Sequence, residues 1–214
     1  VYSACGFFHN KKNSFAKKLY DGVFKKSARQ IDFCTGLTEI ENKKYGELGV
    51  PLSKRDVIPA WIDLKKFKKR KVDREKLRKK YGIQNKKTLL YVGRIHESKG
   101  LQYVVGAIKD LDVNFLIAGR DADFSRTLRE RIRKHGIEDR VKLLGGLGND
   151  ELLKIYSLAD AFVLFSSWEG FGIVVLEAMA SGLPVIVSDR GSLPTLVKNG
   201  ENGIVVKYPD VKNL

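Results

Sequence analysis

Short apolar segments rich in β-branched residues alternate with segments of helical periodicity from Thr88 to the end of the chain. The predicted strands are Thr88–Val92, Val113–Ala118, Val141–Leu144, Ala161–Phe165, Pro184–Ser188 and Gly203–Val206. The predicted helices are Leu101–Leu111, Asp123–His135, Asn149–Leu158, Ile173–Ser181 and Leu193–Lys198. Because the strands are apolar on both faces, they are typical of a sheet covered on both sides. The alternation therefore predicts an α/β fold with a Rossmann-like, doubly wound parallel sheet.

The first part of the chain predicts a different, incomplete unit. Residues 1–63 contain a strand-like start and two αβ steps, with predicted elements at 14–29, 31–36, 38–48 and 56–59. Two such steps cannot close a sheet of their own, so we expect residues 1–63 to be the C-terminal part of another domain in a longer protein. Residues 64–72 then predict a basic linker, and a helix over 73–81 opens a second domain at 73–214 that lacks its final helices.

The excess of positive over negative charge lies entirely in the first part of the chain. Residues 1–87 hold 24 Lys and Arg against 9 Asp and Glu, whereas residues 88–214 hold 16 of each. We expect no nucleic-acid partner, because no zinc-finger spacing or aromatic RNA-binding motif accompanies the charge. Two interpretations of the basic residues 65–80 stay open: a solvated linker and helix face, or contact with an anionic membrane surface.

Cysteine usage and hydropathy favour a reducing compartment and a chain without a membrane-spanning segment. Cys5 and Cys34 are isolated thiols without a CxxC pair, which fits a reducing environment. No apolar stretch approaches the roughly 20 residues that cross a bilayer. We expect a cytoplasmic chain, with peripheral contact at the inner membrane face as the open alternative.

Two cations follow the first predicted strand of the larger domain. Arg94 and Lys99 lie in the loop between Val92 and the helix at Leu101. Ligands of open parallel sheets bind at the carboxyl ends of the strands, and fixed cations beside a helix N-terminus suit a pyrophosphate. We therefore predict that Arg94 and Lys99 bind a diphosphate, and we interpret His96 between them as a loop histidine rather than a base.

Two carboxylates eight positions apart surround a glycine-rich turn after the strand at Ala161. Glu169 precedes Gly170-Phe171-Gly172, and Glu177 lies two turns into an otherwise apolar helix. An unpaired buried carboxylate is costly, so Glu177 needs a partner. A ribose diol of a sugar nucleotide could supply one; a neighbouring Lys or backbone group is the alternative.

Two further loops at the same predicted edge carry weaker signals. Gly145-Gly146-Leu147-Gly148 would let the backbone approach a flat base, and we count Leu147 among the ligand-binding residues. Asn149 or Asp150 would cap the next helix. Asp121 and Asp123 have the spacing of a divalent-metal pair, although Asp123 is also placed to cap the helix that follows.

Taken in order, these motifs resemble a known family. Arg94 and Lys99, the two glutamates around Gly-Phe-Gly, residues 180–186 and Asn199-Gly200-x-Asn202-Gly203 resemble the GT-B, retaining nucleotide-sugar glycosyltransferases (glycosyl transferases group 1), which include glycogen synthase-like and mannosyltransferase enzymes. Residues 57–67 resemble that family's interdomain junction. The chain departs from the family pattern at Ala60-Trp61 and at Thr195, where relatives carry Asn-Gly and Glu.

The resemblance implies a function and a set of roles. Arg94 and Lys99 would bind the donor diphosphate and stabilise its leaving charge, Glu169 would bind the transferred sugar, and Glu177 the ribose. Gly170, Phe171 and Gly172 would contribute backbone amides; no metal or other cofactor is expected. The donor would be a nucleotide-diphosphate sugar and the acceptor an unidentified glycan or lipid. We expect this fragment alone to be inactive in transfer. A non-catalytic nucleotide-binding or membrane-docking module, and a metal-dependent transferase using Asp121 and Asp123, remain the alternatives.

Overall fold

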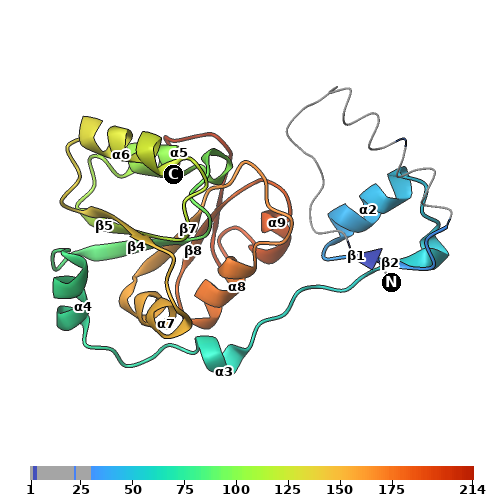
Figure 1. Ribbon diagram of the computed structural model, residues 1–214, viewed down its shortest axis with the longest axis horizontal. Helices are drawn as coiled ribbons and strands as arrows, with labels where there is room; N and C mark the ends of the chain where they lie inside the picture. Colours follow the sequence, from blue (N-terminus) through green and yellow to red (C-terminus); the bar gives the residue numbers. More distant parts are fainter. Residues whose placement is uncertain (1, 4–21, 23–29) are drawn as a thin grey trace. The chain divides into compact units, whose positions relative to one another are not determined.

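The structure is a computed structural model that describes residues 2–3, 22 and 30–214 (Figure 1). The described chain divides into two compact units, Val1–Trp61 and Ile62–Leu214. Apart from Gly22, the helix predicted over residues 14–29 lies outside the described residues.

The smaller unit contains a three-stranded parallel sheet. Its strands are β1 (Tyr2–Ser3), β2 (Cys34–Gly36) and β3 (Arg55–Val57), in that order. Helix α2 (Glu39–Glu47) begins after Thr38, whose side chain accepts a hydrogen bond from the Glu41 backbone N–H. A short 3₁₀ helix, η1 (Leu52–Lys54), follows. The predicted αβ step is present, but the strand expected over 31–36 begins only at Cys34.

The larger unit contains the predicted parallel sheet. Six strands pair in the order β6-β5-β4-β7-β8-β9, all parallel. They are β4 (Lys87–Val92), β5 (Val113–Ala118), β6 (Val141–Gly145), β7 (Ala161–Leu164), β8 (Val185–Ser188) and β9 (Ile204–Val206). Strand order reverses between β4 and β7, so the crevice at their carboxyl ends is where an open sheet of this kind binds ligands.

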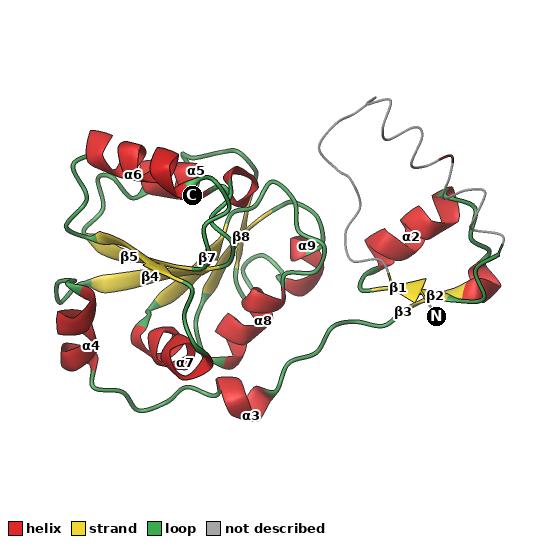
Figure 2. Cartoon of the chain, in the orientation of Figure 1, coloured by secondary structure: helices red, strands yellow, loops and turns green. Residues whose placement is uncertain are grey.

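Helices cover both faces of this sheet, as the strand composition requires. Figure 2 shows α5 (Leu101–Ala107) and α6 (Ser125–Lys134) on one face, and α7 (Asn149–Leu158) and α8 (Ile173–Ala180) on the other. The larger unit also contains α3 (Leu64–Phe67), α4 (Arg74–Tyr81), η2 (Glu97–Lys99) and α9 (Leu193–Leu196). Most residues of the central strands are buried, and Leu90, Phe115 and Phe162 have 0% exposure. The doubly wound fold is thus confirmed.

Two predicted helix caps are wrong. The N-cap residue of α6 is Phe124, and the Asp121 carboxylate, rather than that of Asp123, accepts from the backbone N–H groups of Phe124 and Ser125 at 3.2 and 3.0 Å. Asp123 instead occupies the tight turn, with a φ of +63°. At α7 the N-cap residue is Gly148, without a side-chain bond, and the Asp150 carboxylate pairs with Arg70 and Lys154.

Part of the predicted linker packs on the larger unit. Residues Leu64–Phe67 form helix α3, capped by Asp63. The Phe67 ring is 7% exposed and lies edge-on to Tyr156, with centroids 6.0 Å apart. The Phe67 carbonyl accepts a hydrogen bond from the Ser181 hydroxyl at 2.9 Å. Residues 64–67 therefore belong to the packed structure rather than to a free connection.

Across the described residues, no helix is both long and apolar enough to span a bilayer.

Candidate functional site

Two loops meet where β4 and β7 end. The Ser167 backbone N–H donates to the Ser98 carbonyl at 2.7 Å, and the Ser167 hydroxyl donates to the same oxygen at 3.1 Å. Gly100, with φ of +68°, lets the first loop approach β7, since a Cβ there would lie 2.0 Å from the Phe165 carbonyl oxygen. The loop that carries Arg94 and Lys99 is therefore fixed against the loop that carries Glu169.

This contact brings two of the predicted site residues together. The Lys99 ammonium lies 2.5 Å from Glu169 Oε1, and the two side chains are 14% and 15% exposed. The Ser166 hydroxyl donates to the same Oε1 atom at 3.0 Å. Because both side chains are well shielded from water, salt screens this ion pair little.

The backbone around Glu169 is held by residues that the sequence did not assign. The Ser192 backbone N–H donates to the Glu169 carbonyl at 3.1 Å, and the Ser192 hydroxyl donates to the Phe171 carbonyl at 2.9 Å. Gly191 makes this possible: its φ is +61°, and a Cβ there would lie 2.1 Å from the Glu169 carbonyl oxygen. The Ser188 hydroxyl supports the strand end by donating to the Ser166 carbonyl at 2.6 Å. The glycine and serine after β8 were the sequence signal that could have indicated this contact. Their partners, however, lie about 20 residues away in sequence.

Gly170, Phe171 and Gly172 lead directly into α8. Gly172 has a φ of +89° and is the N-cap residue, with no side chain to occupy the free backbone amides of the first turn. Such amides favour an anion. Phe171 is buried, so its ring anchors the turn.

The other predicted residues at this edge are less constrained. Arg94 is exposed, and its guanidinium has no hydrogen bond or ion pair with any described residue. Its carbonyl accepts from the hydroxyl of buried Tyr91 at 2.7 Å. Burial, together with the Glu169 charge, raises the Tyr91 pKa, so this hydroxyl stays a donor. Leu147 is half-buried after β6 and packs against the core.

Glu177 lies in a separate environment. It is half-buried in α8, and its Oε2 accepts a hydrogen bond from the Tyr156 hydroxyl at 2.8 Å. Burial raises the Glu177 pKa, while the Tyr156 bond and the nearby Lys66 charge oppose that shift. The partner is therefore a tyrosine, which the sequence reasoning missed. Within the described chain, Glu177 forms no hydrogen bond or ion pair with Lys99 or Glu169.

The contacts of His96 and Asp121 bear on the other roles considered for these loops, a catalytic base and a metal ligand. His96 Nδ1 accepts from the Ser98 backbone N–H at 3.1 Å and caps η2, as expected of a loop histidine. The Asp121 oxygens are engaged in the α6 cap. The described residues contain no group of three or more His, Cys, Asp or Glu side chains that could hold a metal ion.

Comparison with known proteins identifies the family. Residues 73–214 match the model of Glycosyl transferases group 1, so the chain belongs to this family. It is 39% identical over 140 residues to an uncharacterized glycosyltransferase of Methanocaldococcus jannaschii, and 36% identical over 138 residues to the alpha-D-kanosaminyltransferase of Streptomyces kanamyceticus. Each match covers 62% of this chain and 36% of the relative.

The fold is likewise that of the GT-B glycosyltransferases. The structure of Anabaena HepE in complex with UDP-glucose matches with a TM-score of 0.81 at 22% identity, over 92% of this chain and 57% of that one. The chain therefore spans little more than half of the solved protein and about a third of the two sequence relatives.

Proposed function

We propose that this chain is the donor-binding part of a retaining glycosyltransferase, which in the full-length protein transfers a sugar from a nucleotide-diphosphate sugar to an acceptor glycan or lipid. One observation carries the proposal: Lys99 and Glu169 meet at the β4/β7 switch point. A cation for the diphosphate and a carboxylate for sugar hydroxyls then lie side by side where the fold binds its ligands. Family membership and the UDP-glucose complex of HepE support a donor of this class.

In this proposal the residues hold and polarise the donor. Lys99 and Arg94 contact the diphosphate, and the amides that begin α8 at Gly172 add partial positive charge. The leaving diphosphate gains negative charge as the glycosidic bond breaks, and one preorganised donor of this kind contributes about 10²–10³ in rate. Glu169 accepts hydrogen bonds from the sugar, and Glu177 from the ribose. The acceptor hydroxyl attacks the sugar carbon on the same face from which the diphosphate leaves, and the leaving diphosphate takes the proton of that hydroxyl. The configuration at the sugar carbon is therefore retained.

The first test is calorimetric binding of UDP, GDP and ADP sugars to the 214-residue chain. We expect at least one to bind, and Lys99→Met to weaken it by about 10- to 100-fold, because a charge-assisted contact is lost. Arg94→Ala should also weaken it. Lys86→Met is the matched control: Lys86 is also partly buried and ion-paired, with Asp112 at 2.7 Å, but it lies just before the opposite end of β4. Absence of binding by all three classes, or equal losses in the two lysine variants, would contradict the proposal.

Transfer itself is tested on the full-length protein with a bound donor and a range of acceptors. Binding without transfer or donor hydrolysis would favour the non-catalytic module. Adding EDTA tests the alternative of a metal-dependent transferase, which would lose activity with the chelator. We expect donor binding and transfer to be unchanged, because the Asp121 carboxylate is engaged by the first amides of α6.

Contact between residues 65–80 and an anionic membrane stays a prediction. Four basic residues in this segment are already ion-paired, which reduces the charge free to attract lipid: Arg70, Arg74, Lys79 and Lys80.

A further inference from the structure

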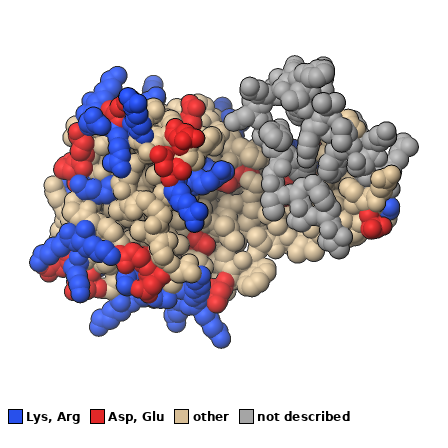
Figure 3. Space-filling model, viewed as in Figure 1, with Lys and Arg blue, Asp and Glu red and all other residues tan. Residues whose placement is uncertain are grey.

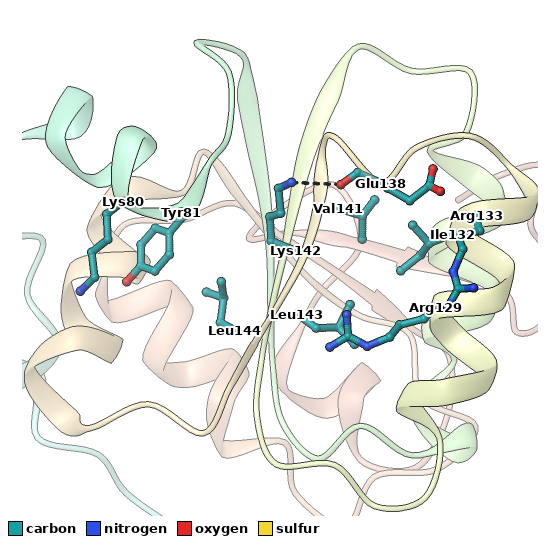
Figure 4. A pocket seen from close by; sticks show the side chains of 10 residues that line it. All are labelled: Lys80, Tyr81, Arg129, Ile132, Arg133, Glu138, Val141, Lys142, Leu143 and Leu144. Atoms are coloured by element: carbon teal, nitrogen blue, oxygen red, sulfur yellow. Dashed lines mark hydrogen bonds between the residues drawn. The ribbon is translucent and has the colours of Figure 1, made fainter.

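A hollow lies along the outer edge of the sheet, beside β6 rather than at the carboxyl ends of the strands. It measures about 440 Å³, within the range of ligand-binding pockets. Figure 4 shows its walls: the end of α4 lies on one side of β6, and α6 with the following turn lies on the other. We call this the β6-edge surface; it is lined by Lys80, Tyr81, Arg129, Ile132, Arg133, Glu138, Val141, Lys142, Leu143 and Leu144.

The charges of the β6-edge surface are unbalanced. Four cations face one carboxylate, the exposed Glu138. Lys80 is paired with Glu151, but Arg129, Arg133 and Lys142 have no carboxylate partner among the described residues. Lys142 donates only to the Glu138 backbone carbonyl, at 3.0 Å (Figure 4). The surface therefore has unsatisfied affinity for anionic groups.

Helix α6 supplies an internal comparison for these charges. Arg126 and Glu130 form an i,i+4 ion pair at 3.3 Å on a face that is outside the hollow. Arg129 and Arg133 occupy the same spacing on the face that lines the hollow, yet both are cations. Like charges at this spacing repel each other and destabilise the helix, and a bound anion would relieve that repulsion.

Apolar side chains lie on both flanks of β6 beside its unpaired edge, Leu143 on the α6 side and Leu144 on the α4 side. Leu143 and Leu144 are only half-buried, and Tyr81 lies beside Leu144. In the described sheet β6 pairs with β5 alone, so its outer edge presents backbone N–H and C=O groups. An edge of this kind accepts an added strand, whose alternate side chains face the sheet's flanks. A free phosphate or a lipid headgroup would not use these backbone groups.

We propose that the β6-edge surface docks an extended acidic segment of a partner protein. The segment adds as a strand to β6. Its apolar residues cover Leu143, Leu144 and Tyr81, and its carboxylates pair with Arg129, Arg133 and Lys142. None of these residues belongs to the loops that carry Lys99 and Glu169, so the docking proposal does not rest on donor binding.

The test begins with a displayed library of random peptides about 10 residues long, selected on the 214-residue chain. We expect enrichment of peptides that carry both acidic and apolar residues on each of their two faces, because Arg129 and Leu143 lie on one flank of β6 and Lys142 and Leu144 on the other. An enriched peptide, labelled and titrated by fluorescence anisotropy, should bind at least about tenfold more weakly to the Arg129→Glu, Arg133→Glu double variant. The matched control is Arg131→Glu with Lys134→Glu, which makes the same charge change on exposed residues of α6 outside the hollow. It should bind the peptide within about twofold of the parent chain.

Strand addition is tested with the same peptide carrying N-methyl groups at alternate amides. One set of alternate positions should abolish binding and the other should leave it, because only every second residue of an added strand bonds to the edge. Circular dichroism establishes that each protein variant is folded. The proposal is overturned if no acidic peptide is enriched, if both charge variants lose binding equally, or if neither methylation pattern affects binding. Binding of phosphatidylglycerol vesicles without binding of any peptide would also overturn it. So would a finding that the Arg129→Glu, Arg133→Glu variant differs from the parent chain only in how strongly it self-associates.

Discussion

Glu169 and Glu177 lie eight residues apart, and the structure places them in two different environments. Glu169 is at the ligand edge of the sheet, paired with Lys99 at 2.5 Å, and its backbone is held by Ser192. Glu177 is inside α8 with a neutral partner, the Tyr156 hydroxyl at 2.8 Å. The first carboxylate is stabilised by charge, whereas the second is only partly compensated and its pKa is raised by burial. The two regions should therefore respond differently to mutation and to pH.

The largest expected effect comes from displacing the Glu169 loop. Gly191→Ala forces a side chain into a left-handed backbone and places its Cβ 2.1 Å from the Glu169 carbonyl oxygen. We expect a loss of roughly 2–4 kcal/mol in the free energy of unfolding, measured by urea denaturation, together with loss of donor binding.

Gly200→Ala is the matched control for this change. Gly200 also has a positive φ, of +80°, but a Cβ there would meet nothing within 4 Å. It should cost roughly 1 kcal/mol from backbone conformation alone and leave donor affinity unchanged. Equal effects of the two substitutions would show that the contact with Glu169 has no particular importance.

The pH dependence of donor affinity distinguishes Glu177 from Glu169. Its pKa in the folded chain is raised above 4.5, so as pH falls it becomes protonated sooner than an ordinary Glu and loses its ability to accept from both ribose hydroxyls. Donor affinity should therefore fall with decreasing pH at values above 4.5, and Tyr156→Phe should move that fall to higher pH, because the bond that lowers the pKa is gone. Calorimetric titration across pH with each variant measures both.

The same shift has the opposite consequence for folding stability. Between the unfolded pKa and the raised folded pKa the native state binds more protons, so stability falls as pH rises through that window. Glu177→Gln should remove this slope in thermal melts, whereas Glu169→Gln should leave it in place. If the pH dependence of stability persisted in the Glu177→Gln variant, it would arise from another titratable group.

The smallest expected effect is at Ser166. Ser166→Ala removes the hydroxyl that donates to Glu169 Oε1 at 3.0 Å but leaves the ion pair with Lys99. Because Glu169 is proposed to contact the sugar, affinity for the nucleotide sugar should drop by roughly 2- to 10-fold while affinity for the nucleoside diphosphate stays constant. Ser157→Ala, which removes a buried hydroxyl bonded to the Leu153 carbonyl, should change neither affinity. A parallel loss for both ligands would indicate a general structural role for Ser166.

The sequence by itself determined the fold class, because strands that are apolar on both faces have one stable solution, a parallel sheet between two helical layers. It also placed Arg94, Lys99 and Glu169 after the correct strands. Helix ends were less accurate: local polar residues compete for each cap, and Asp121 rather than Asp123 reached the free amides of α6.

Only the tertiary structure decided the partners. The hydroxyls of Ser166 and Tyr156 leave no periodic or spacing signal, and Ser192 reaches Glu169 across 23 residues of chain. The linker prediction at 64–72 also missed the packing of Phe67 on Tyr156, because a basic segment with one aromatic side chain does not reveal in sequence which surface will bury that ring. The pair Glu169 and Glu177 has one spacing but two environments, since strand order and helix packing, rather than sequence separation, fix what surrounds a side chain.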